Sequence, residues 1–256
     1  MVIIKSKKEI AAMREGGKKL AEIMRQIEKK VFPGQNTQVL DELAARLVFA
    51  IGGEAVFKNF GKESGHPFPG NICASLNDEV VHGIPGKNKK IQEGDLLKID
   101  IGMRYQGLVT DMARTFLVKS VSPEAEKLAR VTEQSFWKGV KKIRAGAQLS
   151  EYSRAVQKYV ESRGFSVVRN LVGHGVGREL HEDPYVPNYY DKKDPSLVLK
   201  EGMTLALEPM VNAGGFRTVL AKDGWVFRTK DGQLSAHYEN TIVVTKDGAE
   251  VLTIYK

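Results

Sequence analysis

The segment LLKIDIGMRYQGLVTDMARTFLV, residues 96–118, limits what this chain can fold into more than any other stretch. Apolar and polar residues alternate on both sides of a turn near Tyr105 and Gln106, which predicts a β-hairpin. A turn centred there places Asp100 opposite Asp111, with Cβ atoms roughly 5 Å apart, where like charges repel. A hairpin this apolar needs a reason for holding two carboxylates together.

The chain has 256 residues, enough to bury a substantial core as one large domain or as two fused halves. No apolar run reaches the roughly 18 residues of a transmembrane helix, and residues 1–15 lack the apolar core of a signal peptide. A single cysteine, Cys73, excludes an internal disulfide framework and fits a reducing compartment. We therefore expect a cytoplasmic monomer that does not contact a membrane.

The net charge of +8 has two interpretations. A lysine-rich solvated surface is the simpler one. The other is attraction to nucleic acid, for instance ribosomal RNA. Composition does not separate them.

The expected elements occur in the same order twice. A helix with a capping box at Ser6 is broken at Pro33-Gly34, and a second helix and strands follow. The order then repeats from a helix that starts at Ser122-Pro123. We expect an internally duplicated α/β protein with a shared antiparallel sheet, its halves spanning about residues 1–120 and 121–256.

Two short matches support the duplication. EGDLLKID (93–100) resembles EGMTLALE (201–208), which predicts that Asp100 and Glu208 close equivalent strands. VVHGI (80–84) resembles VGHGV (172–176), which predicts similar settings for His82 and His174. A site at the centre of such a protein would collect acids from both halves.

Four acids lie in apolar segments that read as core strands: Asp100, Asp111, Glu208 and Glu239. Four carboxylates could not all stay ionised in a common interior without cations. Each could instead pair with its own lysine or arginine, which for any single acid is the better interpretation. For four acids in equivalent contexts, with the glycine-flanked His174 nearby, divalent metal is the better account.

Carboxylate-rich sites with one imidazole prefer manganese, iron(II) or cobalt. Two ions that share bridging carboxylates can hold a hydroxide poised to attack an amide carbonyl. We therefore predict two divalent ions, with manganese, iron(II), cobalt and zinc as the candidates. Asp100 and Asp111 would face each other because metal ions lie between them.

The histidines and the cysteine divide into two groups. His174 in GHGVG and His181 in HEDP are candidates for stabilising a tetrahedral intermediate or passing a proton. We interpret His66 and His237 as structural or surface residues. We reject Cys73 as a nucleophile, because a thiol within an apolar strand is more often a small buried hydrophobe.

The motifs together resemble a known family. KIDIG with a second aspartate eleven residues after the first, GHGVGRELHEDP, EPMVNAG and YENTIVVT resemble methionine aminopeptidases of the short, bacterial-like type I. The resemblance covers nearly the whole chain. It implies the α+β pita-bread fold, with pseudo-twofold duplicated halves around a central antiparallel sheet, in a single catalytic domain over residues 1–256.

The same resemblance implies an activity and a metal centre. The expected reaction is metal-dependent hydrolysis of the first peptide bond of nascent proteins and peptides that begin with methionine, preferentially when the second residue is small. Asp100 would chelate one metal, Asp111 and Glu239 would bridge both, and His174 and Glu208 would complete the other metal's shell.

The family also implies roles around the substrate. Glu208 would be the general base, His181 would contact the scissile carbonyl, and His82 would lie near the scissile nitrogen and the free amine. The methionine pocket would map onto Phe68, Cys73, Leu180, Met210 and Trp225, a soft apolar lining suited to a thioether.

The chain departs from the family at three positions of the expected pocket. Phe68 and Leu180 stand where a tyrosine and an aromatic residue are expected, and Gly65 stands where another tyrosine often lies. The segment between His181 and Glu208 is also slightly altered in length. These departures affect the shape of the pocket and leave the metal ligands unchanged.

A basic stretch follows NAGG and resembles the family's ribosome-facing loop. It contains Arg217, Lys222, Arg228 and Lys230. A solvated hairpin is an equally good interpretation of each residue alone.

Three rival functions remain at the level of sequence. An X-prolyl aminopeptidase or prolidase would typically carry a sizeable N-terminal domain and a different histidine pattern. A type II methionine aminopeptidase would carry a long helical insertion in its second half. A binding protein with this fold would have lost metal ligands, whereas all five are present.

Overall fold

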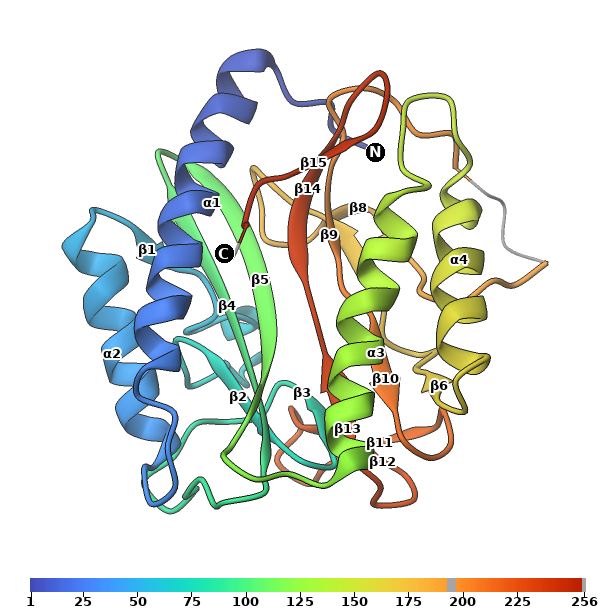
Figure 1. The fold of residues 1–256 in the computed structure, drawn as a ribbon. Helices are drawn as coiled ribbons and strands as arrows, with labels where there is room; N and C mark the ends of the chain where they lie inside the picture. The colour runs from blue at the N-terminus through green and yellow to red at the C-terminus, as the bar shows by residue number, and fades with distance from the viewer. Residues whose placement is uncertain (193–196, 255–256) are drawn as a thin grey trace.

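In the computed structural model of the protein, residues 1–192 and 197–254 are described. Two pairs of helices lie on either side of the long central strands (Figure 1). The helices are α1 (Lys7–Glu28), α2 (Thr37–Ala50), α3 (Pro123–Val140) and α4 (Leu149–Glu161), with a short 3-10 helix η1 (Lys62–Ser64).

The helices begin where the sequence predicts. Ser6 forms a capping box with Glu9 at the start of α1, and Ser122 caps α3 with proline at its first position. Each helix pair buries its apolar face in a separate core. One core joins α1 and α2 to the first-half strands, and the other joins α3 and α4 to the second-half strands.

Two main antiparallel sheets carry the site. In the first, β4 (Leu96–Tyr105) pairs with β1 (Glu54–Ala55), β2 (Cys73–Leu76) and β5 (Leu108–Leu117). The second has the order β15 (Ala249–Val251), β14 (Asn240–Val244), β9 (Thr204–Leu207), β7 (Gly173–Gly175), β8 (Glu182–Val186).

Two smaller three-stranded sheets complete the structure. One is β13 (Ser235–His237), β10 (Met210–Asn212), β6 (Ser166–Val167), and the other is β11 (Thr218–Leu220), β12 (Phe227–Thr229), β3 (Glu79–Val81). Within residues 1–192 and 197–254, no helix is both long and apolar enough to cross a membrane.

The two main sheets meet where β5 lies beside β14. The main chains of Ala113 and Glu239 exchange two hydrogen bonds, of 3.3 and 3.0 Å. Thr241 Oγ1 accepts from the main-chain N–H of Asp111 at 2.8 Å and donates to its carbonyl at 2.9 Å. β2-β4-β5 thus faces β14-β9-β7 across a seam, which confirms the predicted pseudo-twofold fold around a central antiparallel sheet.

The predicted hairpin exists, but its register is shifted. Tyr105 pairs with Leu108, and the turn residues Gln106 and Gly107 both have positive φ, 50° and 81°, as a two-residue type I′ turn requires. Asp100 is therefore opposite Ala113, and Asp111 is opposite Gly102. The predicted direct opposition of the two aspartates is wrong; they are diagonal neighbours. They still share a face, because the pairing shifts by an even number of residues.

The two sequence matches fare differently. β4 and β9 do occupy equivalent central positions, although Asp100 lies within β4 rather than closing it, whereas Glu208 directly follows β9. The prediction of similar settings for His82 and His174 is wrong. His174 lies on β7, which pairs with β9, whereas the strands that pair with β4 are β1, β2 and β5. His82 instead follows β3, which pairs with β12.

Gly17 provides a test of how closely α1 packs. A Cβ added there would lie 2.4 Å from the carbonyl oxygen of Leu252, a main-chain atom that cannot move alone. Although alanine gains roughly 1 kcal/mol over glycine within a helix, we expect Gly17→Ala to lower the free energy of unfolding by about 1–3 kcal/mol through overpacking. Urea denaturation measures this change. Gly248→Ala is the control, since nothing lies within 4 Å of its Cβ; equal midpoints for both variants would contradict the close contact.

Candidate metal centre

A cavity of about 600 Å³ collects every residue of the predicted site. The strands β2, β4, β5, β7 and β10 and the segments after β3 and β9 all contribute to its wall. The predicted residues that line it are Phe68, Cys73, His82, Asp100, Asp111, His174, Leu180, His181, Glu208, Met210, Trp225 and Glu239.

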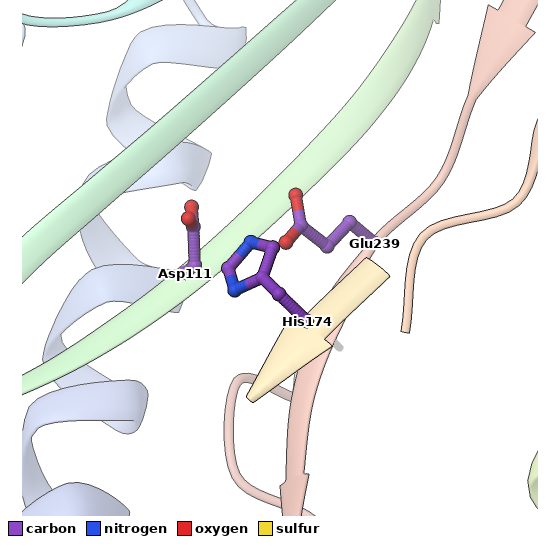
Figure 2. A group of neighbouring side chains, drawn as sticks. All are labelled: Asp111, His174 and Glu239. Atoms are coloured by element: carbon purple, nitrogen blue, oxygen red, sulfur yellow. The ribbon is translucent and has the colours of Figure 1, made fainter. Parts of the chain in front are cut away.

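Three of the predicted ligands converge most closely. Asp111 on β5, His174 on β7 and Glu239 just before β14 point toward one another in Figure 2, and one ligand atom from each lies within 4.8 Å of the others. Asp100 joins them from β4, where the charge of Asp111 helps to raise the pKa of its carboxyl group. Glu208 Oε1 lies 3.6 Å from His174 Nε2.

Burial controls the protonation of this group. It raises the pKa of Asp111 to about 7 and the pKa values of the other three acids well above their usual range. For Asp100, the neighbouring charges of Asp111 and Glu208 raise the pKa further. Each acid therefore resists ionisation unless positive charge is brought to it.

His174 is held in the form that ligates metal. Burial lowers its pKa to about 3, so the imidazole is neutral at neutral pH. Its Nδ1 lies 2.8 Å from the carbonyl oxygen of Gly175. That acceptor favours a proton on Nδ1 and leaves the lone pair of Nε2 directed toward the carboxylates.

The donor set fits divalent metal better than separate ion pairs. Buried Oδ1 atoms of Asp100 and Asp111 have no hydrogen-bond partner among the described residues. Arg114, the guanidinium near this seam, donates to the main-chain oxygens of Ala113 and Glu239 rather than serving as a counter-ion for all four acids. Oxygen-rich ligands with one imidazole suit hard to borderline cations.

Two further histidines face the same cavity. His181 packs edge-on against His174, with ring centroids 4.4 Å apart, and against Phe60. His82 has a φ of 58° and packs edge-on against Trp225. Burial lowers the pKa of His181 and lowers that of His82 to about 4. Both rings are therefore neutral at neutral pH and can donate a hydrogen bond.

A buried ion pair positions the loop that carries Leu180 and His181. Glu182 Oε1 accepts from the main-chain N–H groups of Arg178 and Glu179, at 2.6 and 3.0 Å. Its other oxygen accepts from the ammonium of Lys5, whose side chain is fully buried. The segment before α1, which carries Lys5, thus holds this loop in place.

The predicted apolar pocket forms one wall of the cavity. Trp225 packs edge-on against Phe68, with ring centroids 5.3 Å apart. Burial, together with the charge of Asp100, raises the pKa of the Cys73 thiol well above its usual range. A thiol that stays protonated is a poor nucleophile, which agrees with the rejection of a cysteine mechanism.

Sequence reasoning missed Phe60 and did not place His237 beside the acids. Phe60 lines the cavity beside His181. His237 is buried, with Nε2 3.6 Å from Glu208 and 3.9 Å from Glu239. Its position two residues before Glu239 was the available signal, because alternate residues of an extended segment face the same side. His66 does remain at the surface, where it stacks on Trp225.

The comparisons with known proteins agree with this geometry. The profile of Metallopeptidase family M24 matches residues 11–246. A methionine aminopeptidase of Clostridium perfringens is 45% identical over 257 residues, covering 100% of both chains. The chain belongs to this metallopeptidase family, in its methionine aminopeptidase branch.

Solved structures of the family show the same fold. A methionine aminopeptidase from Thermotoga maritima superposes with a TM-score of 0.94 at 42% identity, covering 99% of each chain. The prolidase from Pyrococcus horikoshii has a TM-score of 0.79 at 24% identity, and the present chain covers 65% of it. At that identity the prolidase likeness shows the pita-bread fold alone. Membership of the family implies the use of divalent metal, and the buried acid and histidine cluster fits it.

The raised pKa values of the buried acids should make the stability of the metal-free protein depend on pH. From about pH 7.5 the site histidines are neutral in both the folded and the unfolded states, so the acids alone decide the slope there. The pKa values of Asp100, Glu208 and Glu239 are raised well above their usual range in the folded state, so the folded protein binds more protons than the unfolded chain and loses stability as pH rises.

We therefore expect the melting temperature of chelator-treated protein to fall between pH 7.5 and pH 8.5, and the metal-loaded protein to show little change. Differential scanning fluorimetry measures both. Asp111→Asn should flatten the slope of the chelated protein. An equal slope with and without metal would argue against the acids as the metal's ligands.

Proposed function

We propose that this chain removes the N-terminal methionine from nascent proteins and peptides, preferentially when the second residue is small. One observation carries the proposal: five side chains with metal-ligating chemistry converge in one cavity whose adjoining wall is apolar. Full-length similarity to methionine aminopeptidases supports it. We take residues 1–256 as one catalytic unit, with halves of about 1–120 and 121–256.

The residues that would hold two divalent ions are Asp100, Asp111, His174, Glu208 and Glu239. Asp111 and Glu239 would bridge the two ions, as the family resemblance implies, and their ligand atoms lie within 4.8 Å of that of His174. When bound, such ions polarise a carbonyl and make bound water a nucleophile at neutral pH. Manganese, iron(II), cobalt and zinc are the candidates.

The other groups act on the substrate directly. Glu208 is the proposed general base, at the end of β9 beside His174. Asn188 steadies it by donating to its main-chain carbonyl at 3.1 Å. His181, neutral because of burial, would donate a hydrogen bond to the carbonyl oxygen as negative charge develops there. His82 would face the scissile nitrogen and the free amine.

The apolar wall would select methionine. Phe68, Cys73, Leu180, Met210 and Trp225 present ring, sulfur and aliphatic surface, which suits an unbranched thioether side chain. Phe68 lacks the hydroxyl of the tyrosine that the family pattern has at its position, and Leu180 stands in place of an aromatic residue. This wall is therefore more uniformly apolar than the family pattern. We place the enzyme in the cytoplasm, as a monomer.

The activity has a direct test. Chelator-treated protein should release no methionine from a peptide that begins Met-Gly and should regain release with one or more of the four metals, iron(II) being added anaerobically. Peptides that begin Met-Leu and Ala-Pro should be poor substrates. Mass spectrometry of the products measures each release. Release from Ala-Pro alone would move the chain to the prolyl enzymes, and no release with any metal would favour a binding protein.

Glu208→Gln should lower kcat by about 10²–10⁴-fold, as the loss of a general base does. Asp111→Asn should abolish the metal-restored activity. Both variants are compared with wild type at saturating metal. A Glu208→Gln enzyme of normal kcat would exclude Glu208 as the base.

The basic residues near β11 and β12 are a proposed ribosome contact. Arg228 differs from the rest, because its guanidinium donates to Asp78 at 2.9 Å and to Glu79 at 2.7 Å. Its charge is already compensated, which leaves Arg217, Lys222 and Lys230 to carry the contact.

Charge reversal tests this contact. We expect Lys222→Glu combined with Lys230→Glu to weaken co-sedimentation with ribosomes several-fold at low salt, since a pair of lost phosphate contacts is salt-sensitive. Activity on short peptides should be unchanged. Unaltered co-sedimentation would leave the solvated-hairpin interpretation.

A further inference from the structure

His237 lies against the metal centre without belonging to its proposed ligands. Its side chain is 2% exposed. Its Nε2 lies 3.6 Å from Glu208 Oε2 and 3.9 Å from Glu239 Oε2. Among the described residues, this buried nitrogen has no hydrogen-bond partner within reach. A buried polar atom directed at two carboxylates needs a functional explanation.

The main chain holds His237 in this place. Thr115 Oγ1 on β5 accepts from the main-chain N–H of His237 at 3.0 Å and donates to its carbonyl at 2.8 Å. On the other side, β13 pairs His237 with Met210 of β10, whose side chain lines the cavity. The main chain of His237 is thus anchored from both neighbouring strands, and its imidazole is buried.

The two carboxylates can approach the imidazole, whose main chain is held in place. Glutamate side chains rotate about three bonds, so a small rotation brings either oxygen to hydrogen-bond distance of Nε2. Catalytic hydrogen bonds are often long before the bound complex forms and shorten within it. A hydrogen-bond donor that contacts a metal-binding carboxylate fixes the orientation of that carboxylate.

We infer that His237 is a positioning residue, whose imidazole donates its Nε2–H to Glu208 and Glu239 and so orients both carboxylates toward the metal. The inference rests on the proposed metal centre and goes beyond it. The role requires a hydrogen-bond donor at this position and not an imidazole as such. It therefore differs from a sixth ligand, which would need the lone pair of Nε2.

Glutamine and leucine separate the two roles. In His237→Gln the side-chain amide keeps a donor directed at the same carboxylates, whereas His237→Leu fills the space with no polar atom. Tyr238→Phe is the matched control. It changes the neighbouring residue, whose ring lies under Arg114 and beside Phe136, away from the acids.

The measurement is Mn²⁺ binding to chelator-treated protein by isothermal titration calorimetry, with circular dichroism to show that each variant is folded. We expect His237→Leu to bind Mn²⁺ 10–100-fold more weakly than wild type, the usual loss when a hydrogen-bond partner of a metal ligand is removed. His237→Gln should recover most of that loss, and Tyr238→Phe should match wild type. With saturating Mn²⁺, kcat on a Met-Gly peptide should follow the same order.

Two results would overturn the inference. Wild-type affinity in His237→Leu would show that no donor is needed, and equal weakness of His237→Gln and His237→Leu would indicate a ligand or a packing role. The binding measurement uses no substrate. Failure to release methionine would therefore contradict the proposed function and leave this test valid, whereas a wild-type protein that binds no Mn²⁺ would contradict the metal centre as well.

Discussion

The burial of four carboxylates at one seam is the constraint on which the rest of this structure depends. Ionised acids in an apolar interior repel one another and lose hydration, so burial raises all four pKa values. The surrounding histidines are neutral for the same reason, since burial lowers their pKa values. A neutral imidazole can ligate or donate a hydrogen bond, and it adds no positive charge that would compete with a metal ion. The same low-polarity surroundings thus make the site unstable without cations and selective for them.

Neither half of the chain supplies this site alone. Asp100 and Asp111 come from the first half, and His174, Glu208 and Glu239 come from the second. The halves are joined where β5 lies beside β14, through the main-chain bonds of Ala113 with Glu239 and the bracket of Thr241 on Asp111. The contacts that join the two sheets therefore involve the very residues that carry the carboxylates. The same contacts therefore stabilise the seam and fix the geometry of the site.

Sequence periodicity reveals which face a residue occupies more readily than which residue it meets. Alternation alone placed Asp100 and Asp111 on one face, and the structure keeps them there despite a shifted register, because only an odd shift would separate them. The exact turn depended on Gln106 and Gly107 adopting positive φ, which the sequence indicated only weakly. The five-residue match around His82 and His174 failed because similarity that short carries no information about strand pairing. The place of His237 beside the acids was missed because a lone histidine was weighed by itself, without the face it shares with Glu239.

The ion pair of Lys5 and Glu182 shows how the fold extends control of the site beyond the cavity. Glu182 follows His181 directly, and its carboxylate accepts hydrogen bonds from two main-chain N–H groups of the same loop. Without the ammonium of Lys5, that carboxylate would be a buried charge with no counter-ion from Lys5 and an unfilled hydrogen-bonding position. Removing one partner of a buried ion pair in this way destabilises a fold far more than replacing both partners with apolar residues. The side chain of Lys5 reaches it by crossing Gly177, where a Cβ would lie 2.3 Å from Lys5 Cε. Gly177, the last glycine of the GHGVG motif, thus makes room for the side chain of Lys5 and not for a ligand. Through Lys5, the segment before α1 helps to set the position of His181.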